Sequence, residues 1–337
     1  MINFIQFTLT RAFLAIVTLL IVCFIVFSLM ELVPGTCAER YLAFKNTQGS
    51  QITFEDIEAE KVRLGLDKPF LYRYGKWVSD IVVKQDFGDS CILRISINEL
   101  LSGRFVLSLA IAITALIFSY VIAIPVGIIS ASTKYVSLDQ TLKFISYLGI
   151  ALPNFLVALC IMLFMTVYFG DTMTGLFSQE YENAPWSSAK LKDFLSRAWL
   201  PIFVLGWNAT AFALQTVRAL MLDENDKLYV MAARARGISG MSLLWRYPAK
   251  HSLGPVINSI GFDLNRIFSA LPIVALILIL TEAGALLIEA LARSNDQQLA
   301  GAIIFLLTAT IVFVNFVTDI ILAIMDPRIR KGVMGGN

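Results

Sequence analysis

The sequence predicts an all-α membrane protein with six transmembrane helices. Only 15% of its 337 residues are charged and 57% are hydrophobic, and the mean hydropathy is +0.73. These values exclude a disordered chain and an ordinary water-soluble protein. The charged residues gather in loops between long uncharged runs, which is the pattern that a bilayer imposes. The partner that the composition predicts is therefore the lipid bilayer, and a net charge of +2 gives no reason to expect nucleic acid.

Five uncharged runs are long enough to cross a bilayer, because about 20 residues at 1.5 Å each span a hydrocarbon core of roughly 30 Å. They are residues 12–30, 105–133, 144–170, 198–217 and 297–318. A sixth run, residues 253–281, is interrupted by Asp263 and Arg266. Pro153 predicts a kink in the third run, because proline donates no backbone hydrogen bond. Five spans are the minimum, and six are preferred.

The charges divide the chain into three parts. Residues 1–32 form a tail and the first transmembrane helix, and the lone Arg11 favours a cytoplasmic N-terminus. Residues 33–103 form a mixed-charge cap on the outer side, between the first and second helices. Residues 104–337 form the transmembrane core. The cap is expected to stiffen the outer mouth of the protein, to provide a docking surface for another protein, or to do both.

Two of the four cysteines, Cys37 and Cys91, fall in the cap. They can form a disulfide if the outer side is an oxidising compartment, and the sequence leaves open whether they face each other. Cys23 and Cys160 lie inside apolar runs, where a thiol usually serves as a small apolar side chain.

A basic segment, residues 223–252, separates two of the apolar runs and is too polar to span a bilayer. Its pattern predicts helices over residues 226–236 and 239–250. Gly237 stands between them, where a helix end favours a residue that tolerates positive φ. A helix, a glycine turn and a second helix would form a rigid helix–turn–helix to which another protein can bind.

The residues of this segment resemble the coupling-loop motif of ABC-transporter permeases, specifically of the dipeptide/oligopeptide importer branch and its first (B-type) permease. Met231 stands where that motif often has Glu. The resemblance implies that the matching residues transmit work from an ATPase. They are Tyr229, Ala232, Ala233, Arg234, Arg236, Gly237, Ile238 and Ser239, with His251 and Pro255 downstream.

The resemblance extends over nearly the whole chain, in motifs that occur in the family's order. Matching stretches lie at residues 34–35, 64–69, 86–90, 125–127, 152–155 and 326–330. Two stretches depart from the family's pattern. Thr36 and Cys37 replace an Asp-Pro pair, and only Gly284 remains of a Pro-Gly-Leu-Gly element. The second departure suggests an outer gate of different shape.

The resemblance implies the type I ABC importer permease fold and an ATP-driven importer of di- and oligopeptides in the bacterial inner membrane. Both chain termini would be cytoplasmic. The implied partners are a second homologous permease, two cytoplasmic ATPase subunits and a periplasmic binding protein. ATP and Mg would bind the ATPases, and this chain would hold no cofactor.

The sequence offers no catalytic constellation of its own. It contains no Walker A, HExxH or CxxC pattern, and His251 is its only histidine. We therefore expect neither an enzyme nor a metal site, and we expect His251 to be a residue of the coupling segment at a helix end.

The unusual feature of the core is its intramembrane charge. Asp263 and Arg266 are three apart and can pair along one helix face. Asn154, Asn208 and Asn258 are further polar residues of the apolar runs. Two interpretations remain open: an ion pair that satisfies itself between helices, or a polar lining of the translocation path that handles peptide termini.

Two rival functions are weighed against peptide import. The same machinery could carry nickel chelates or oligosaccharides, which related permeases transport. An ion-driven secondary transporter is less favoured, because the chain lacks matching broken helices in two repeat halves and a carboxylate relay.

Overall fold

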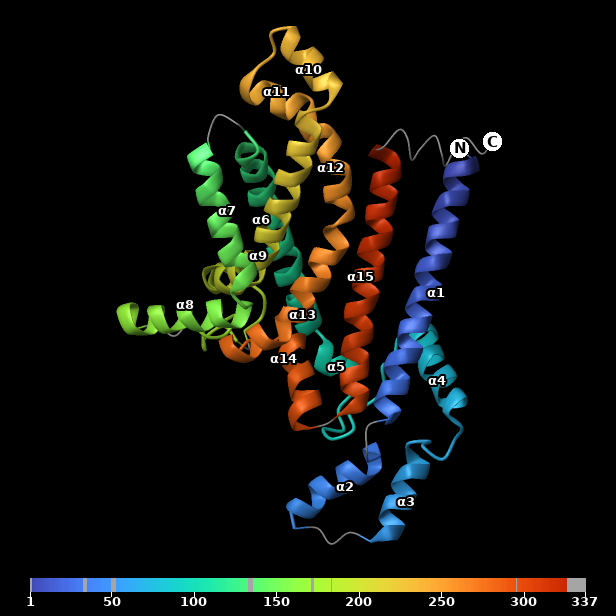
Figure 1. Ribbon diagram of the computed structural model, residues 1–337. Coiled ribbons are helices and arrows are strands. Elements are labelled where there is room, and N and C mark those ends of the chain that lie inside the picture. Colours follow the sequence, from blue (N-terminus) through green and yellow to red (C-terminus); the bar gives the residue numbers. More distant parts are fainter. Residues whose placement is uncertain are drawn as a thin grey trace. The chain divides into compact units, whose positions relative to one another are not determined.

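A computed structural model describes residues 2–32, 35–49, 53–132, 136–170, 173–182, 184–294 and 296–325 (Figure 1). Within these ranges the chain is helical, and the sole β-type pairing is an isolated bridge between Asp89 and Ser96. The elements are α1 (Ile2–Leu32), α2 (Cys37–Thr47), α3 (Phe54–Arg63), α4 (Phe70–Ser79), η1 (Asp80–Lys84), α5 (Ile97–Leu101), α6 (Arg104–Ser130), α7 (Val136–Ala151), α8 (Asn154–Phe169), α9 (Ser188–Asn225), α10 (Leu228–Ala235), α11 (Gly240–Arg246), α12 (Pro248–Asn258), α13 (Ile260–Leu278), α14 (Ala283–Ile288), η2 (Glu289–Arg293) and α15 (Gln297–Met325).

The predicted all-α membrane architecture is confirmed. Within the described ranges, five helices are long and apolar enough to cross a membrane, and the count is six if α7 and α8 form one broken span. The five are α1, α6, α9, α13 and α15, with α5 continuing the apolar stretch of α6. The basic tail at residues 326–330 lies outside the described residues.

The third predicted span is broken far more sharply than a kink. The axes of α7 and α8 differ by 101°. Pro153 is the N-cap of α8 with extended backbone angles (φ −62°, ψ 141°), so the α7 hydrogen-bond ladder ends before it. The sequence identified the residue that breaks the helix but not the size of the bend.

The helices form two compact units that do not follow chain order. Unit 1 comprises the described parts of residues 1–15, 109–280 and 311–337, and unit 2 comprises those of residues 16–108 and 281–310. Residues 281–310 thus join the unit that contains the predicted cap, which the linear boundaries 33–103 and 104–337 did not anticipate.

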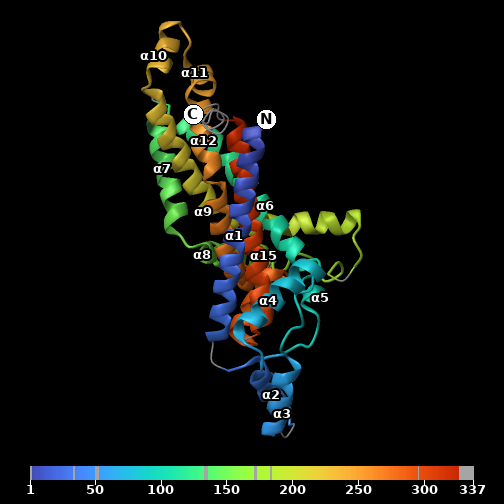
Figure 2. The same cartoon turned by 90° about the vertical axis from the view of Figure 1, so that its right-hand side faces the viewer.

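In unit 1, α9 is the central helix. It packs against α7, α8, α12 and α13, and α7 runs beside it in both views (Figures 1 and 2). Two glycines allow close approach: a Cβ at Gly127 would lie 2.8 Å from Val217, and one at Gly149 would lie 2.7 Å from Ala211. Such distances do not occur between real side chains, so α6 and α7 contact α9 through glycine.

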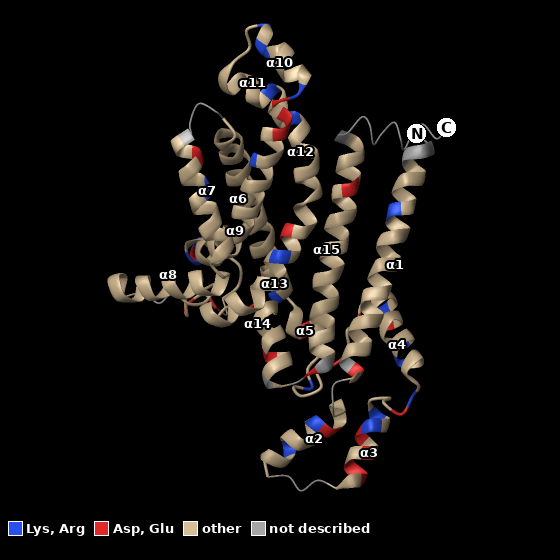
Figure 3. Ribbon diagram, in the orientation of Figure 1, with Lys and Arg blue, Asp and Glu red and all other residues tan. Residues whose placement is uncertain are grey.

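In unit 2, Cys37 and Cys91 are disulfide-bonded, with 5.8 Å between their Cα atoms. Thr36 with Glu39 and Thr53 with Asp56 form capping boxes at the starts of α2 and α3. Charged residues are concentrated on these two helices (Figure 3). An aromatic cluster joins α1 to α4, where Phe27 lies 5.6 Å from Trp77 between ring centroids.

Two buried carboxylates of unit 2 sit at helix starts. Glu282 is fully buried and accepts from the backbone N–H groups of Gly284 (2.7 Å) and Ala285 (3.1 Å), as well as from the Ser108 hydroxyl. Asp296 accepts from Ser90 (2.5 Å) and from the Leu299 N–H (3.1 Å). Both side chains therefore act as N-caps, which explains how an acidic group is tolerated there.

Candidate functional site

The segment at residues 223–252 folds as a tight helix–turn–helix. Gly237 adopts φ +82°, its N–H donates to the Arg234 carbonyl (2.9 Å), and the Ile238 N–H donates to the Ala233 carbonyl (3.2 Å). These two bonds define a Schellman motif, in which the residue after the helix must be left-handed. The glycine turn expected from the sequence is therefore present.

This helix–turn–helix has a small core of its own. Val230 and Ala233 of α10 pack against Leu243 of α11, and Tyr229 and Ile238 flank them. The surface of this helix–turn–helix carries exposed apolar side chains: Leu228 is 80% exposed, Met231 46% and Trp245 45%. An exposed apolar surface on a basic segment is typical of a protein interface.

Polar contacts fix the helix–turn–helix to the end of α9. The Tyr229 hydroxyl donates to Glu224 Oε2 (2.5 Å), and Arg234 Nη2 donates to Asn225 Oδ1 (2.7 Å). Burial and, after it, the bond to Glu224 raise the pKa of Tyr229, so it stays a neutral donor at physiological pH. The His251 ring lies 4.9 Å from the Tyr229 ring. These contacts connect α10 to the end of α9.

The second predicted helix, residues 239–250, is wrong at its C-terminal end. The helix α11 ends at Arg246, and α12 begins at Pro248. Tyr247 between them has φ −116° and ψ −77°, and Pro248 has no backbone N–H with which to continue the hydrogen-bond ladder of α11. The remaining motif residues divide between the two faces: Ala232, Arg236 and Ser239 are exposed, whereas Ala233 is buried.

A second candidate site is a cavity of about 310 Å³ within unit 1. It is lined by side chains of α8, α9 and α13: Asn154, Phe155, Asn208, Arg266, Ser269, Ala270 and Ile273. Three of the five residues predicted for the translocation path, Asn154, Asn208 and Arg266, therefore line one cavity. Asn258 is exposed at the end of α12 and does not line it.

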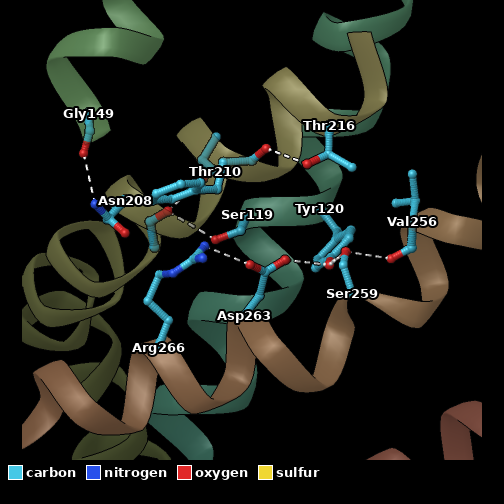
Figure 4. A network of polar contacts seen from close by, with 12 residues as sticks. Ser119, Tyr120, Gly149, Asn208, Thr210, Thr216, Val256, Ser259, Asp263 and Arg266 are labelled. Carbon is cyan, nitrogen blue, oxygen red and sulfur yellow. Dashed lines mark hydrogen bonds and ion pairs between the residues drawn. The ribbon is translucent and has the colours of Figure 1, made fainter. Parts of the chain in front are cut away.

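Asp263 does not line the cavity, but it contacts Arg266, which does (Figure 4). Its Oδ1 accepts from Arg266 Nη1 (3.0 Å), and its Oδ2 accepts from the Tyr120 hydroxyl (2.6 Å). The Asp263 side chain is only 6% exposed, whereas that of Arg266 is 38% exposed. Within this ion pair, the positively charged Arg266 therefore lines the cavity, and the negatively charged Asp263 does not.

The sequence analysis missed the other partners of this network. Tyr120 on α6 joins Asp263 to Ser259, whose hydroxyl lies 3.0 Å away. Phe212 on α9 stacks under the guanidinium of Arg266, with 3.7 Å from Cζ to the ring centroid. Neither residue is close to Asp263 in the sequence, so no local spacing could have identified it.

A second missed cluster joins α6, α7 and α9. Arg218 binds both oxygens of Asp139, at 2.6 and 2.9 Å. Ser130 and Lys143 contact the same carboxylate, at 2.5 and 3.0 Å. Arg218 lies 79 residues from Asp139, so no local spacing could have paired them. The cluster ties α7 to the helix that continues into the coupling segment.

Comparison with known families decides which protein class this arrangement represents. Residues 123–331 match the family model of the binding-protein-dependent transport system inner membrane component, and residues 4–95 match the model of that system's N-terminal membrane component. The chain belongs to this family. It is a permease subunit of an ABC importer.

The relatives named here match between 79% and 96% of the permease. It is 28% identical over 321 residues to the oligopeptide transport system permease protein AppB of Bacillus subtilis, covering 95% of this chain and 98% of the relative. It is 26% identical to a putative peptide transport system permease protein of Brucella abortus, covering 96% and 98%. It is 29% identical to the inner membrane ABC transporter permease protein YejB of Escherichia coli O157:H7, covering 79% and 74%.

A solved structure shares the fold. The permease resembles a chain of the MetNI methionine ABC transporter with a TM-score of 0.53 and 16% sequence identity, covering 68% of this chain and 97% of that one. Within the described residues no group of three His, Cys, Asp or Glu side chains is placed to hold a metal ion.

Proposed function

We propose that this permease imports di- and oligopeptides that a periplasmic binding protein delivers. The peptide class is supported by the relatives named above, whose names specify oligopeptide or peptide transport. The same names give no support to nickel chelates or oligosaccharides. The chain would act in the bacterial inner membrane beside a second, homologous permease, with its cap of residues 33–103 facing the binding protein.

The energy for transport would come from two cytoplasmic ATPase subunits that bind ATP and Mg. Their contact is the helix–turn–helix of α10 and α11, presented by residues 223–252 on the cytoplasmic side together with both chain termini. Closure of the ATPases would move this segment and, through α9, shift the bundle between two states.

The observation that carries the proposal is a packed helix–turn–helix with exposed apolar side chains, directly continuing the 38-residue helix α9. A flexible tether would absorb motion, but a segment with its own core and fixed contacts to Glu224 and Asn225 transmits it. The cavity beside α9, lined by Asn154, Asn208 and Arg266, is the proposed part of the translocation path.

The turn at Gly237 provides the test. In Gly237→Val a β-branched residue must adopt φ +82°, at a cost of roughly 1–2 kcal/mol, so we expect transport-coupled ATP hydrolysis of the assembled complex to fall about tenfold. Gly254→Ala is the matched control, because Gly254 is helical and its Cβ would meet no atom within 4 Å. Gly237→Asn should retain part of the activity, since Asn tolerates this conformation.

Normal coupling in Gly237→Val would contradict the role of the turn. A purified complex that transports peptides without any ATPase, driven by a proton gradient, would contradict the importer assignment and favour a secondary transporter.

A further inference from the structure

The cavity in unit 1 has a chemical character that the family assignment does not specify. Its walls are apolar at Phe155, Ala270 and Ile273 and polar at Asn154, Asn208 and Arg266. Its volume of about 310 Å³ is at the lower end of the range of small-molecule sites. A short peptide segment, with a polar end and an uncharged side chain, matches both the size and the lining.

Arg266 is held in a defined position at this wall. The carboxylate of Asp263 accepts a hydrogen bond from Arg266 Nη1, and the Phe212 ring stacks against the guanidinium of Arg266. Such stacking and pairing reduce the freedom of a long side chain before any ligand arrives. Most of the guanidinium N–H donors have no acceptor among the described residues, and the side chain is 38% exposed.

The counter-charge is arranged so that it does not compete for a ligand. Asp263 is 6% exposed, and its second oxygen is taken by the Tyr120 hydroxyl. An incoming anion therefore meets the guanidinium edge first. Because Asp263 already neutralises part of the positive charge, the anion would bind weakly, as a site that must release its cargo requires.

Asn154 supplies the complementary group. Its Oδ1 is buried and finds no hydrogen-bond partner among the described residues, although the side chain lines the same cavity as Arg266. A buried acceptor without a donor is costly unless a ligand satisfies it. Peptide N–H groups are such donors, and they accompany every peptide carboxylate.

We propose that Arg266 is a specificity-determining residue that binds the C-terminal carboxylate of the peptide during passage. Asp263 and Phe212 position its guanidinium, and Asn154 accepts a peptide N–H. This inference rests on the proposed peptide-import function and assigns the polar recognition to one residue of the path. A transit site of this kind favours peptides with a free carboxylate over otherwise identical peptides that end in an amide.

The test compares uptake of alanine peptides of two to five residues, as free acids and as C-terminal amides, by proteoliposomes that contain the complete transporter. The wild type should prefer the free acids. Arg266→Gln should lower the ratio of free-acid to amide uptake roughly tenfold, since a charge-assisted bond that only the free acid makes is lost. Arg266→Lys should recover part of the preference because it keeps the charge.

Two further variants separate recognition from folding. Asp263→Asn with Arg266→Gln removes both charges and avoids an unpaired buried carboxylate, so it should fold and show the same loss of preference. Arg11→Gln is the matched control: Arg11 also pairs with a carboxylate in an apolar helix, Asp319 at 3.2 Å, but it does not line the cavity. Its ratio of acid to amide uptake should equal that of the wild type.

The outcomes distinguish the two proposals. A wild type that takes up no peptide of either kind contradicts peptide import and this inference with it. A wild type that imports acids and amides equally, or an Arg266→Gln variant that keeps the wild-type ratio, overturns the role of Arg266 alone. Binding of both probes to the binding protein, measured separately, assigns any preference that arises before the permease.

Discussion

The two units of the permease satisfy buried carboxylates in different ways. In unit 2, Glu282 and Asp296 accept hydrogen bonds from backbone N–H groups and from the hydroxyls of Ser108 and Ser90. In unit 1, the buried Asp263 instead pairs with Arg266 at 3.0 Å, and the partly buried Asp139 pairs with Arg218 at 2.6 Å, much as the partly buried Glu60 of unit 2 pairs with Arg94.

The difference has a physical meaning. Backbone donors at a helix start are fixed by the local fold, so a carboxylate that accepts from them stabilises one geometry. An arginine on a long side chain can exchange one anion for another and can link helices that shift relative to each other. Glu282 and Asp296 are thus fixed in place, whereas the arginine beside Asp263 can exchange one anion for another.

The largest effect should follow from Glu282→Ala. The change leaves Ser108 and two backbone N–H groups of α14 without their acceptor in a fully buried place. We expect the free energy of unfolding to fall by about 2–4 kcal/mol, measured by thermal or chemical unfolding in detergent. Glu282→Gln keeps one acceptor oxygen and should lose less than half as much. A change below about 0.5 kcal/mol in the alanine variant would remove the distinction between the units.

A smaller effect should follow from Arg218→Gln. Asp139 keeps Ser130 and Lys143 as partners, so the cost in stability should be about 1–2 kcal/mol. Because Arg218 connects α7 to α9, we also expect less transport per ATP hydrolysed, and this loss should be larger than the loss of folded protein accounts for. Lys143→Gln removes the more exposed cation from the same carboxylate and should cost at most about 1 kcal/mol. Equal losses in coupling for both variants would contradict a specific link through Arg218.

The smallest effect should be a pH dependence within unit 2. A hydrogen bond from the Lys61 ammonium and, after it, one from the Thr36 backbone N–H lower the pKa of Glu39. A carboxyl with a lowered folded-state pKa stabilises the fold above its unfolded pKa, about 4.3, and loses that contribution as the pH falls further. The melting temperature of Glu39→Gln should therefore change less between pH 6 and pH 3 than that of the wild type.

Asp56 offers the matched comparison, because its pKa is lowered first by a hydrogen bond from the Thr53 backbone N–H, and no described residue forms a salt bridge with it. Asp56→Asn should reduce the pH dependence in the same direction but by less. An acid-induced loss that is identical in the wild type and in both variants would mean that other carboxylates control it.

Local sequence patterns predicted local structure well. The left-handed turn at Gly237 follows from a glycine after an alanine-rich helix, and the pairing of Asp263 with Arg266 follows from their spacing of three residues. The all-α class and the span count followed from hydropathy. The family's motifs, read in order, correctly indicated a permease.

Contacts between distant parts of the chain could not be predicted in this way. Tyr120 meets Asp263 across 143 residues, and Arg218 meets Asp139 across 79. The 101° bend at Pro153 depends on what α7 and α8 pack against, which a single proline does not specify. The coupling role of Tyr229 to Ser239 and the path role of Asn154, Asn208, Asn258, Asp263 and Arg266 remain predictions.

The bond between Cys37 and Cys91 encloses a segment that contains α2, α3, α4 and η1. A protease that cuts the backbone once anywhere between the two cysteines would produce two pieces still held together by sulfur. Such nicked molecules would migrate as intact chains on a denaturing gel and separate only after a reducing agent is added. Surface loops of this segment can thus be clipped without releasing either half of the polypeptide.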